Sequence, residues 1–115
     1  MDFFSIVEVV YGDSCLQLHS AELFLNRIII EISPEQLQQI RETNGELNIG
    51  SAAILKFSRS DSRLFIRGKK YRANLTSIRR LKFNKFHAVF TFSKLTPIEN
   101  KELRNTIENI LALVN

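Results

Sequence analysis

The segment Arg27–Ile40 constrains the fold more than any other stretch of the chain. It opens with an apolar run rich in isoleucine, a composition typical of a strand that is buried on both faces. The run stops at Ser33 and Pro34, because proline fixes its own φ and supplies no N–H to a sheet. Two continuations are open: a helix that Ser33 caps with Gln36 as its partner in a capping box, or a tight corner into a strand that starts at Leu37. The local chemistry favours the helix.

Most of the remaining chain has the patterns of strands. Strands are predicted at Phe3–Tyr11, Cys15–His19, Leu23–Ile32, Ser51–Ser58, Arg63–Arg67, Tyr71–Leu75, Ile78–Leu81 and Phe86–Phe92. Two of them have a clear buried face, formed by Ala53, Leu55 and Phe57 in one and by Phe86, Ala88, Phe90 and Phe92 in the other. Ser20–Glu22 is expected to reverse the chain, and the pair Asn44-Gly45 predicts a turn.

The end of the chain predicts an amphipathic helix. Thr96 and Glu99 have the spacing of a capping box, with Pro97 at the first helical position. Five apolar residues then recur at helical spacing: Leu103, Ile107, Ile110, Leu111 and Val114. This apolar stripe is expected to dock on the strands, because a small domain needs that core. Residues 1–115 are therefore predicted to form one mainly β domain, a small barrel of six to eight strands with a C-terminal amphipathic helix.

The composition limits where such a domain works. No run approaches the ~18 apolar residues of a membrane span, so no membrane insertion is expected. The first residues lack the positive start and the small-residue cleavage site of a signal peptide. The single cysteine, Cys15, cannot form an intramolecular disulfide, which favours the cytoplasm.

Positive charge is concentrated in the second half of the chain. Between Lys56 and Lys94 there are 12 Lys and Arg residues and one acid, Asp61, or 12 − 1 = +11, whereas the rest of the chain has 4 basic and 11 acidic residues, or −7. This asymmetry predicts a positive sector that can face an acidic partner. The alternative is that solvated strand faces simply carry Lys and Arg.

No pattern of catalytic or metal-binding residues is present in the sequence. His19 and His87 have no cluster of Cys, His or Asp at ligand spacing, so a metal site is not expected. Cys15 and His19 lie on one face of a predicted strand, but four positions along a strand correspond to ~13 Å, too far for a nucleophile and its base. There is also no G-x-S-x-G motif and no phosphate-binding glycine loop. We expect neither enzyme activity nor a cofactor.

The segment Glu31-Ile-Ser33-Pro-Glu-Gln36-Leu resembles the [D/N]-x-S-x-x-G motif of PilZ domains, which are small β-barrels. Ser33 matches the motif, Glu31 stands where Asp or Asn is usual, and Gln36 replaces the glycine. The resemblance extends from about Leu25 to the C-terminus, and the phenylalanine-rich His87–Phe92 is similar to the strand that closes the barrel. It implies a barrel fold with a final helix.

The resemblance implies cyclic di-GMP as the ligand, which PilZ domains hold with an R-x-x-x-R segment on the N-terminal side of the serine motif. Here no arginine precedes Arg27, and R-x-x-x-R occurs only at Arg59–Arg63 and Arg63–Arg67, after that motif. Paired arginines make charge-assisted contacts to phosphate, and glycine lets the backbone approach the ligand. Both features are missing, so the usual binding mode is expected to be lost.

The expected function is therefore that of a non-enzymatic adaptor that contacts a protein partner, and the positive sector would suit an acidic one. The resemblance implies roles in motility, type IV pilus assembly or second-messenger signalling. The candidate binding face is basic: Arg59, Arg63, Arg67, Arg79, Arg80 and Lys82. One alternative is a nucleic-acid-binding barrel, because Lys56–Lys94 interleaves basic and aromatic residues. A further alternative is a cyclic di-GMP receptor with a non-standard site.

Overall fold

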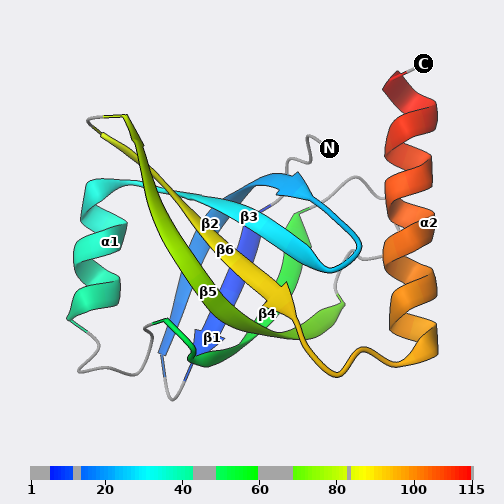
Figure 1. Cartoon of the computed structure of the whole chain (residues 1–115), viewed down its shortest axis with the longest axis horizontal. Helices are drawn as coiled ribbons and strands as arrows, with labels where there is room; N and C mark the ends of the chain where they lie inside the picture. The colour runs from blue at the N-terminus through cyan, green and yellow to red at the C-terminus, as the bar shows by residue number, and fades with distance from the viewer. Residues whose placement is uncertain (1–5, 12–13, 43–48, 60–68, 83, 115) are drawn as a thin grey trace.

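The computed structural model describes residues 6–11, 14–42, 49–59, 69–82 and 84–114. Six strands and two helices follow one another in these residues (Figure 1). They are β1 (Ile6–Tyr11), β2 (Ser14–Leu23), β3 (Arg27–Ile32), α1 (Pro34–Arg41), β4 (Ala52–Arg59), β5 (Lys70–Lys82), β6 (Lys85–Phe92) and α2 (Pro97–Val114). The predicted strand Arg63–Arg67 and the predicted turn Asn44-Gly45 lie outside the described residues.

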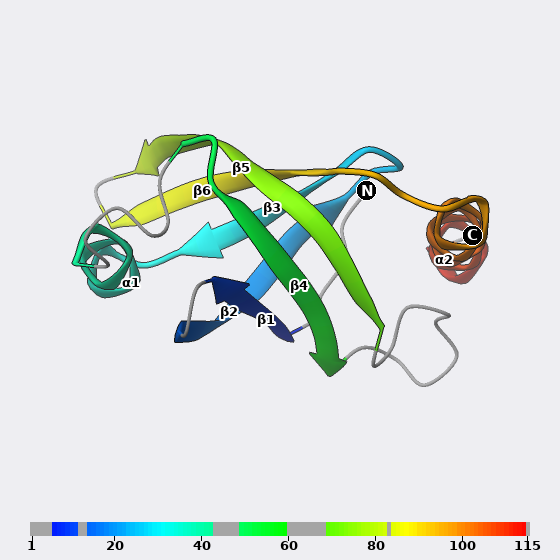
Figure 2. The same cartoon turned by 90° about the horizontal axis from the view of Figure 1, so that it is seen from below.

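The strands form a closed antiparallel barrel in the order β1-β2-β3-β6-β5-β4. Each of the pairs β1–β2, β2–β3, β4–β5 and β5–β6 joins strands that follow one another among the described elements. The barrel is completed by β1 against β4 and by β3 against β6. Helices α1 and α2 lie at opposite ends of it in both views (Figures 1 and 2). The predicted fold class is confirmed.

One face of each strand fills the barrel, as the alternating patterns predict. The fully or almost fully buried strand residues are Val7, Val9, Tyr11, Leu18, Leu23, Ile28, Ile30, Ile32, Ala53, Leu55, Phe57, Tyr71, Ala73, Leu75, Ala88, Phe90 and Phe92. Strand β3 differs from expectation, because it is not buried on both faces: Arg27 is exposed, and Ile29 and Glu31 are only partly buried on its outer side. The barrel has a single interior, so alternate residues of every strand face outward.

Of the two predicted continuations after β3, the structure has the helix, α1. Ser33 is the N-cap, Pro34 is the first helical residue, and Ser33 and Gln36 form a complete capping box. The Ser33 N–H donates to Gln36 Oε1 at 2.9 Å, and the Gln36 N–H donates to Ser33 Oγ at 3.2 Å. Leu37 and Ile40 are buried, so this short helix covers one end of the core.

One turn lies at a different place from the one predicted, and two predicted strands are a single strand. Ser20–Glu22 does not reverse the chain; β2 continues through it to Leu23, with a register shift at that point. The reversal comes later, where the Phe24 N–H donates to Arg27 O at 2.9 Å. The predicted strands Tyr71–Leu75 and Ile78–Leu81 are one strand, β5, whose register shifts between Leu75 and Ser77. A β-bulge inserts a residue without ending a strand, which is why both signals resembled breaks.

Helix α2 begins as predicted. The Thr96 N–H donates to Glu99 Oε1 at 2.9 Å, and the Glu99 N–H donates to Thr96 Oγ1 at 3.1 Å. Leu103 is fully buried and Ile107 packs against the core, so the first half of the predicted apolar stripe docks on the barrel. Among the described residues, no helix is long and apolar enough to span a membrane.

Candidate functional site

The residues of the serine motif lie together at the junction of β3 and α1. A pocket of about 300 Å³ opens there, lined by His19, Glu31, Ile32, Ser33, Gln36, Asn84 and Lys85. The lining comes from β2, β3, the start of α1 and the β5–β6 turn, so four separate parts of the sequence meet at this point. The structure therefore brings Glu31, Ser33 and Gln36 together, as the resemblance implies.

The side chain of Gln36 makes hydrogen bonds to Ser33 and to β2 at this junction. Its Oε1 accepts from the Ser33 N–H, and its Nε2 donates to Gln17 O on β2 at 3.4 Å. A glycine at this position would leave the backbone open to a ligand. With Gln36, the Ser33 hydroxyl and backbone N–H are both used within the capping box. Ser33 and Gln36 of the motif therefore bond to each other.

Glu31 adds a negative charge to the same pocket. Its carboxylate lies 2.6 Å from Lys85 Nζ, with about two fifths of each side chain exposed. The hydrogen bond from Lys85 is the main cause that lowers the pKa of Glu31; desolvation opposes it, and the charges of Lys85, His87 and His19 add to it. Glu31 is therefore ionised at neutral pH. A carboxylate paired with Lys85 leaves less positive charge for a phosphate than the lysine alone would offer.

Basic residues gather on the neighbouring hairpin. Strand β5 continues past its pairing with β4, and the end of the β5–β6 hairpin projects beside α1 (Figure 1). We call the residues Arg79–Lys82 with Asn84–Lys85 the β5–β6 arm. Arg79, Arg80, Leu81 and Lys82 are exposed, with Leu81 at 51%. Among the described residues, neither Arg79 nor Lys82 has an ion-pair partner.

The cross-strand pairing shows which residues lie side by side on this positive surface. Arg79 pairs with His87, His87 with Glu31, and Glu31 with His19, so these four residues form one row across β5, β6, β3 and β2. Lys82 pairs with Lys85 at the end of the arm. Lys85 and both histidines are not among the residues that the sequence predicts for this surface. Only the register reveals them, because they are far from Arg79–Lys82 in sequence or belong to other strands.

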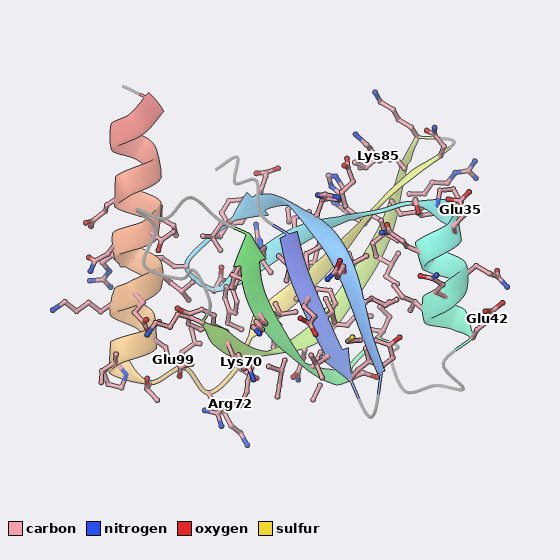
Figure 3. The ribbon with its side chains drawn as sticks, turned by 180° about the vertical axis from the view of Figure 1, so that it is seen from behind. Glu35, Glu42, Lys70, Arg72, Lys85 and Glu99 are labelled. Atoms are coloured by element: carbon pink, nitrogen blue, oxygen red, sulfur yellow. The ribbon has the colours of Figure 1, made fainter. Side chains whose placement is uncertain are left out.

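The residues of the predicted basic face that the structure describes do not all lie together. Arg79, Arg80 and Lys82 lie together on the arm, but Arg59 ends β4, whose Lys56 pairs with Lys70 at the opposite end of β5. Figure 3 shows Lys85 at the α1 end of the barrel and Lys70 and Arg72 toward α2. Arg63 and Arg67 lie outside the described residues, as does the side chain of Arg59.

A second pocket of about 570 Å³ is lined by residues of β1, β4 and β5 and by Ser93 and Lys94, which follow β6. Its lining is mainly apolar, with Val10, Ala52 and Ile54, and Arg72 and Lys94 supply its positive charge. Arg72 Nη2 donates to Lys94 O at 2.9 Å, which holds Lys94 in a left-handed conformation with φ 52°. This conformation is uncommon for a residue other than glycine. The guanidinium thus has a structural partner already.

Within the described part of the chain, no group of three or more His, Cys, Asp or Glu side chains could hold a metal ion. Cys15 is exposed and lies on the outer face of β2 with His19, in line with the sequence interpretation.

No family model matches the sequence, and no curated protein matches it significantly. Among solved structures, the chain is similar to the PlzA protein of Borreliella burgdorferi in complex with c-di-GMP, with a TM-score of 0.54 and 10% sequence identity. The match covers 98% of this chain and 46% of PlzA, so the chain spans about half the length of that protein. At this identity the likeness concerns the fold alone. The chain has a PilZ-like small barrel with a C-terminal helix.

Proposed function

We propose that this protein is a non-enzymatic adaptor that binds an acidic surface of a partner protein through the β5–β6 arm. The observation that carries the proposal is the composition of the arm: Arg79 and Lys82 are exposed without an ion-pair partner among the described residues, next to the exposed Leu81. Cations beside an exposed apolar side chain suit a protein interface, where arginine is enriched. The PilZ-like fold supports a partner in cytoplasmic motility, pilus or second-messenger pathways.

The serine-motif pocket supports an adaptor rather than a nucleotide receptor. Gln36 occupies the place of the glycine, and the hydroxyl and backbone N–H of Ser33 are bonded to Gln36 within the capping box. We therefore expect cyclic di-GMP to bind no more tightly than an unrelated dinucleotide at physiological salt. Isothermal titration calorimetry measures this directly, and a micromolar or tighter site would contradict the expectation.

Cyclic di-GMP binding at a non-standard site is the second candidate function. Two observations favour it: PlzA, part of which is similar to this chain, is in complex with c-di-GMP, and the larger pocket combines an apolar lining with Arg72. If calorimetry detects the nucleotide, Arg72→Ala separates the two pockets. Loss of binding would assign the ligand to the larger pocket, and retention would assign it elsewhere.

The aromatic residues argue against the nucleic-acid alternative. Single-strand binders stack bases on exposed aromatic rings. Here Phe57, Tyr71 and Phe90 are fully buried, Phe92 is almost so, and Phe86 packs against the core. The basic half of the described chain therefore offers charge to an oligonucleotide without these stacking platforms. Such binding should be weak and should vanish by about 0.2 M salt.

The test uses charge reversal on the arm. The double variant Arg79→Glu/Lys82→Glu should lose the partner in a pulldown from the native host, whereas Lys101→Glu/Arg104→Glu on α2 should keep it. Both variants replace two cations by two carboxylates, so they make the same change in charge. Because all four residues are exposed, both variants should melt close to the wild type. A partner retained by the arm variant would refute the proposal. So would tight oligonucleotide binding that persists at 0.2 M salt.

A further inference from the structure

Strand β5 is paired on both sides over only part of its length. On one side its partners in β4 run from Lys56 opposite Lys70 to Ala52 opposite Asn74. Leu75 then accepts from the Gly50 N–H at 2.7 Å and donates to Ser51 O at 3.0 Å. Beyond this point β5 continues to Lys82 and pairs with β6 alone.

The segment Ser77–Lys82 is therefore an open edge: among the described residues, no strand pairs with it on the side away from β6. An open edge presents a row of N–H and C=O groups to which another chain can add as a strand. The barrel is closed over its body, and this segment is a place where the described sheet can be extended.

The charges on this edge distinguish between two candidate occupants, a second copy of this chain and a strand that carries carboxylates. A second copy that paired edge to edge would bring Arg79, Arg80 and Lys82 against the same three residues. Like charges directly opposite one another destabilise a strand pair. Lysine and arginine on an edge strand are a common protection against self-association. The same charges attract a strand that carries carboxylates.

We propose that an extended acidic segment of the partner adds to the open edge of β5 as a further strand. This inference rests on the proposed adaptor function and names how the arm would recognise the partner. The backbone of Ser77–Lys82 would supply hydrogen bonds, and Arg79 and Lys82 would supply cross-strand ion pairs on the outer face.

The two faces of the arm also determine which residue types should alternate along the added segment. Arg79 and Lys82 lie on the side of His87 and Lys85, to which they are paired. Ile78 lies on the other side, where it packs against the core. Successive residues of a strand point to opposite faces, so the fitting segment alternates carboxylates with β-branched apolar residues.

The experiment compares capped, fluorescently labelled peptides of ten residues that alternate glutamate with valine, titrated against the whole chain by anisotropy at low salt. Two further peptides keep this sequence but carry N-methyl groups at the odd or at the even residues. N-methylation removes backbone donors from one edge of the peptide only. We expect one of the two patterns to weaken binding at least tenfold and the other to change it little. The amides of Ser77–Lys82 should become protected from hydrogen exchange in the complex with the parent peptide.

The outcomes separate this inference from the proposed function. If both methylated peptides bind as tightly as the parent, the arm attracts acidic chains without strand addition, and the inference is wrong while the adaptor proposal stands. If no peptide binds, or if concentration-dependent dimers form through Ser77–Lys82, the inference is also wrong. The pulldown with the charge-reversal variants then decides the adaptor proposal by itself.

Discussion

Replacing Tyr71 by phenylalanine should stabilise the protein. Tyr71 lies inside the barrel with 1% of its surface exposed, and its hydroxyl has no hydrogen-bond partner among the described residues. Its ring makes edge contacts with Phe57 and Phe92, with centroids 5.8 and 5.9 Å away. Phenylalanine keeps the ring and these contacts and removes only the hydroxyl.

The expected gain follows from the desolvation of that hydroxyl. An unsatisfied buried polar group costs about 1–3 kcal/mol. Because the neighbourhood can relax around the missing atom, we expect Tyr71→Phe to raise the free energy of unfolding by about 1 kcal/mol. For a chain of this size that corresponds to a rise of about 4 °C in Tm. Urea unfolding and calorimetry measure both quantities.

The effect should also depend on pH. Desolvation, and then the negative charges of Glu102 and Glu99, raise the pKa of Tyr71 above its ordinary value. Because the pKa of Tyr71 is raised in the folded state, its contribution to the free energy of unfolding is fully present below the pKa of the unfolded chain, about 10. That contribution is lost as the pH rises above this value. The variant has no such loss. Its advantage over the wild type should therefore grow between pH 9 and pH 11, values chosen to bracket the unfolded pKa of about 10.

A matched control removes a buried hydroxyl that does have a partner. Thr106 is fully buried, and its Oγ1 donates to Glu102 O at 2.9 Å. Thr106→Val should lower the free energy of unfolding by about 0.5–1.5 kcal/mol, the opposite sign. If Tyr71→Phe also destabilises the protein by 1 kcal/mol or more, the Tyr71 hydroxyl is hydrogen-bonded in solution and the reasoning fails.

Two further substitutions test the helices. Leu103→Asp should unfold the protein, because it places an unpaired carboxylate where Leu103 is fully buried, and Ile107→Asp should destabilise it for a related reason; circular dichroism showing a wild-type melt would mean that α2 is not docked. Ser33→Ala should lower the free energy of unfolding by about 1 kcal/mol through loss of the N-cap of α1, whereas Ser33→Asn, which can still cap, should not.

Much of the fold could be predicted from periodicity and capping chemistry. Ala53, Leu55 and Phe57 alternate cleanly on β4, and the capping boxes at Ser33 and Thr96 mark where both helices begin. These signals are local, so they are visible without knowledge of the partners of each strand. The bulges were not visible in this way, because the residues around Ser20 and Thr76 have the polarity of turns although they belong to strands.

The site was less predictable, because it depends on register. Glu31, Ser33 and Gln36 are close in sequence, and their meeting in one pocket needed only the local motif. Lys85 and His87 enter the same region because β6, besides its hairpin partner β5, pairs with the distant strand β3. No pattern of residue types specifies that pairing from the sequence alone.

Two of the six seams of the barrel join strands that are distant in the chain. One seam pairs Val10 with Ile54, and the other pairs Ile28 with Phe90. Contacts between distant residues require the loop between them to close before any hydrogen bond forms, and chains dominated by such contacts fold in roughly milliseconds to seconds. The hairpins β1–β2 and β5–β6 can form first, but neither encloses a core. We therefore expect the pairing of β1 with β4 and of β3 with β6 to limit the rate of folding, and until both have paired, the chain exposes strand edges along which it can aggregate.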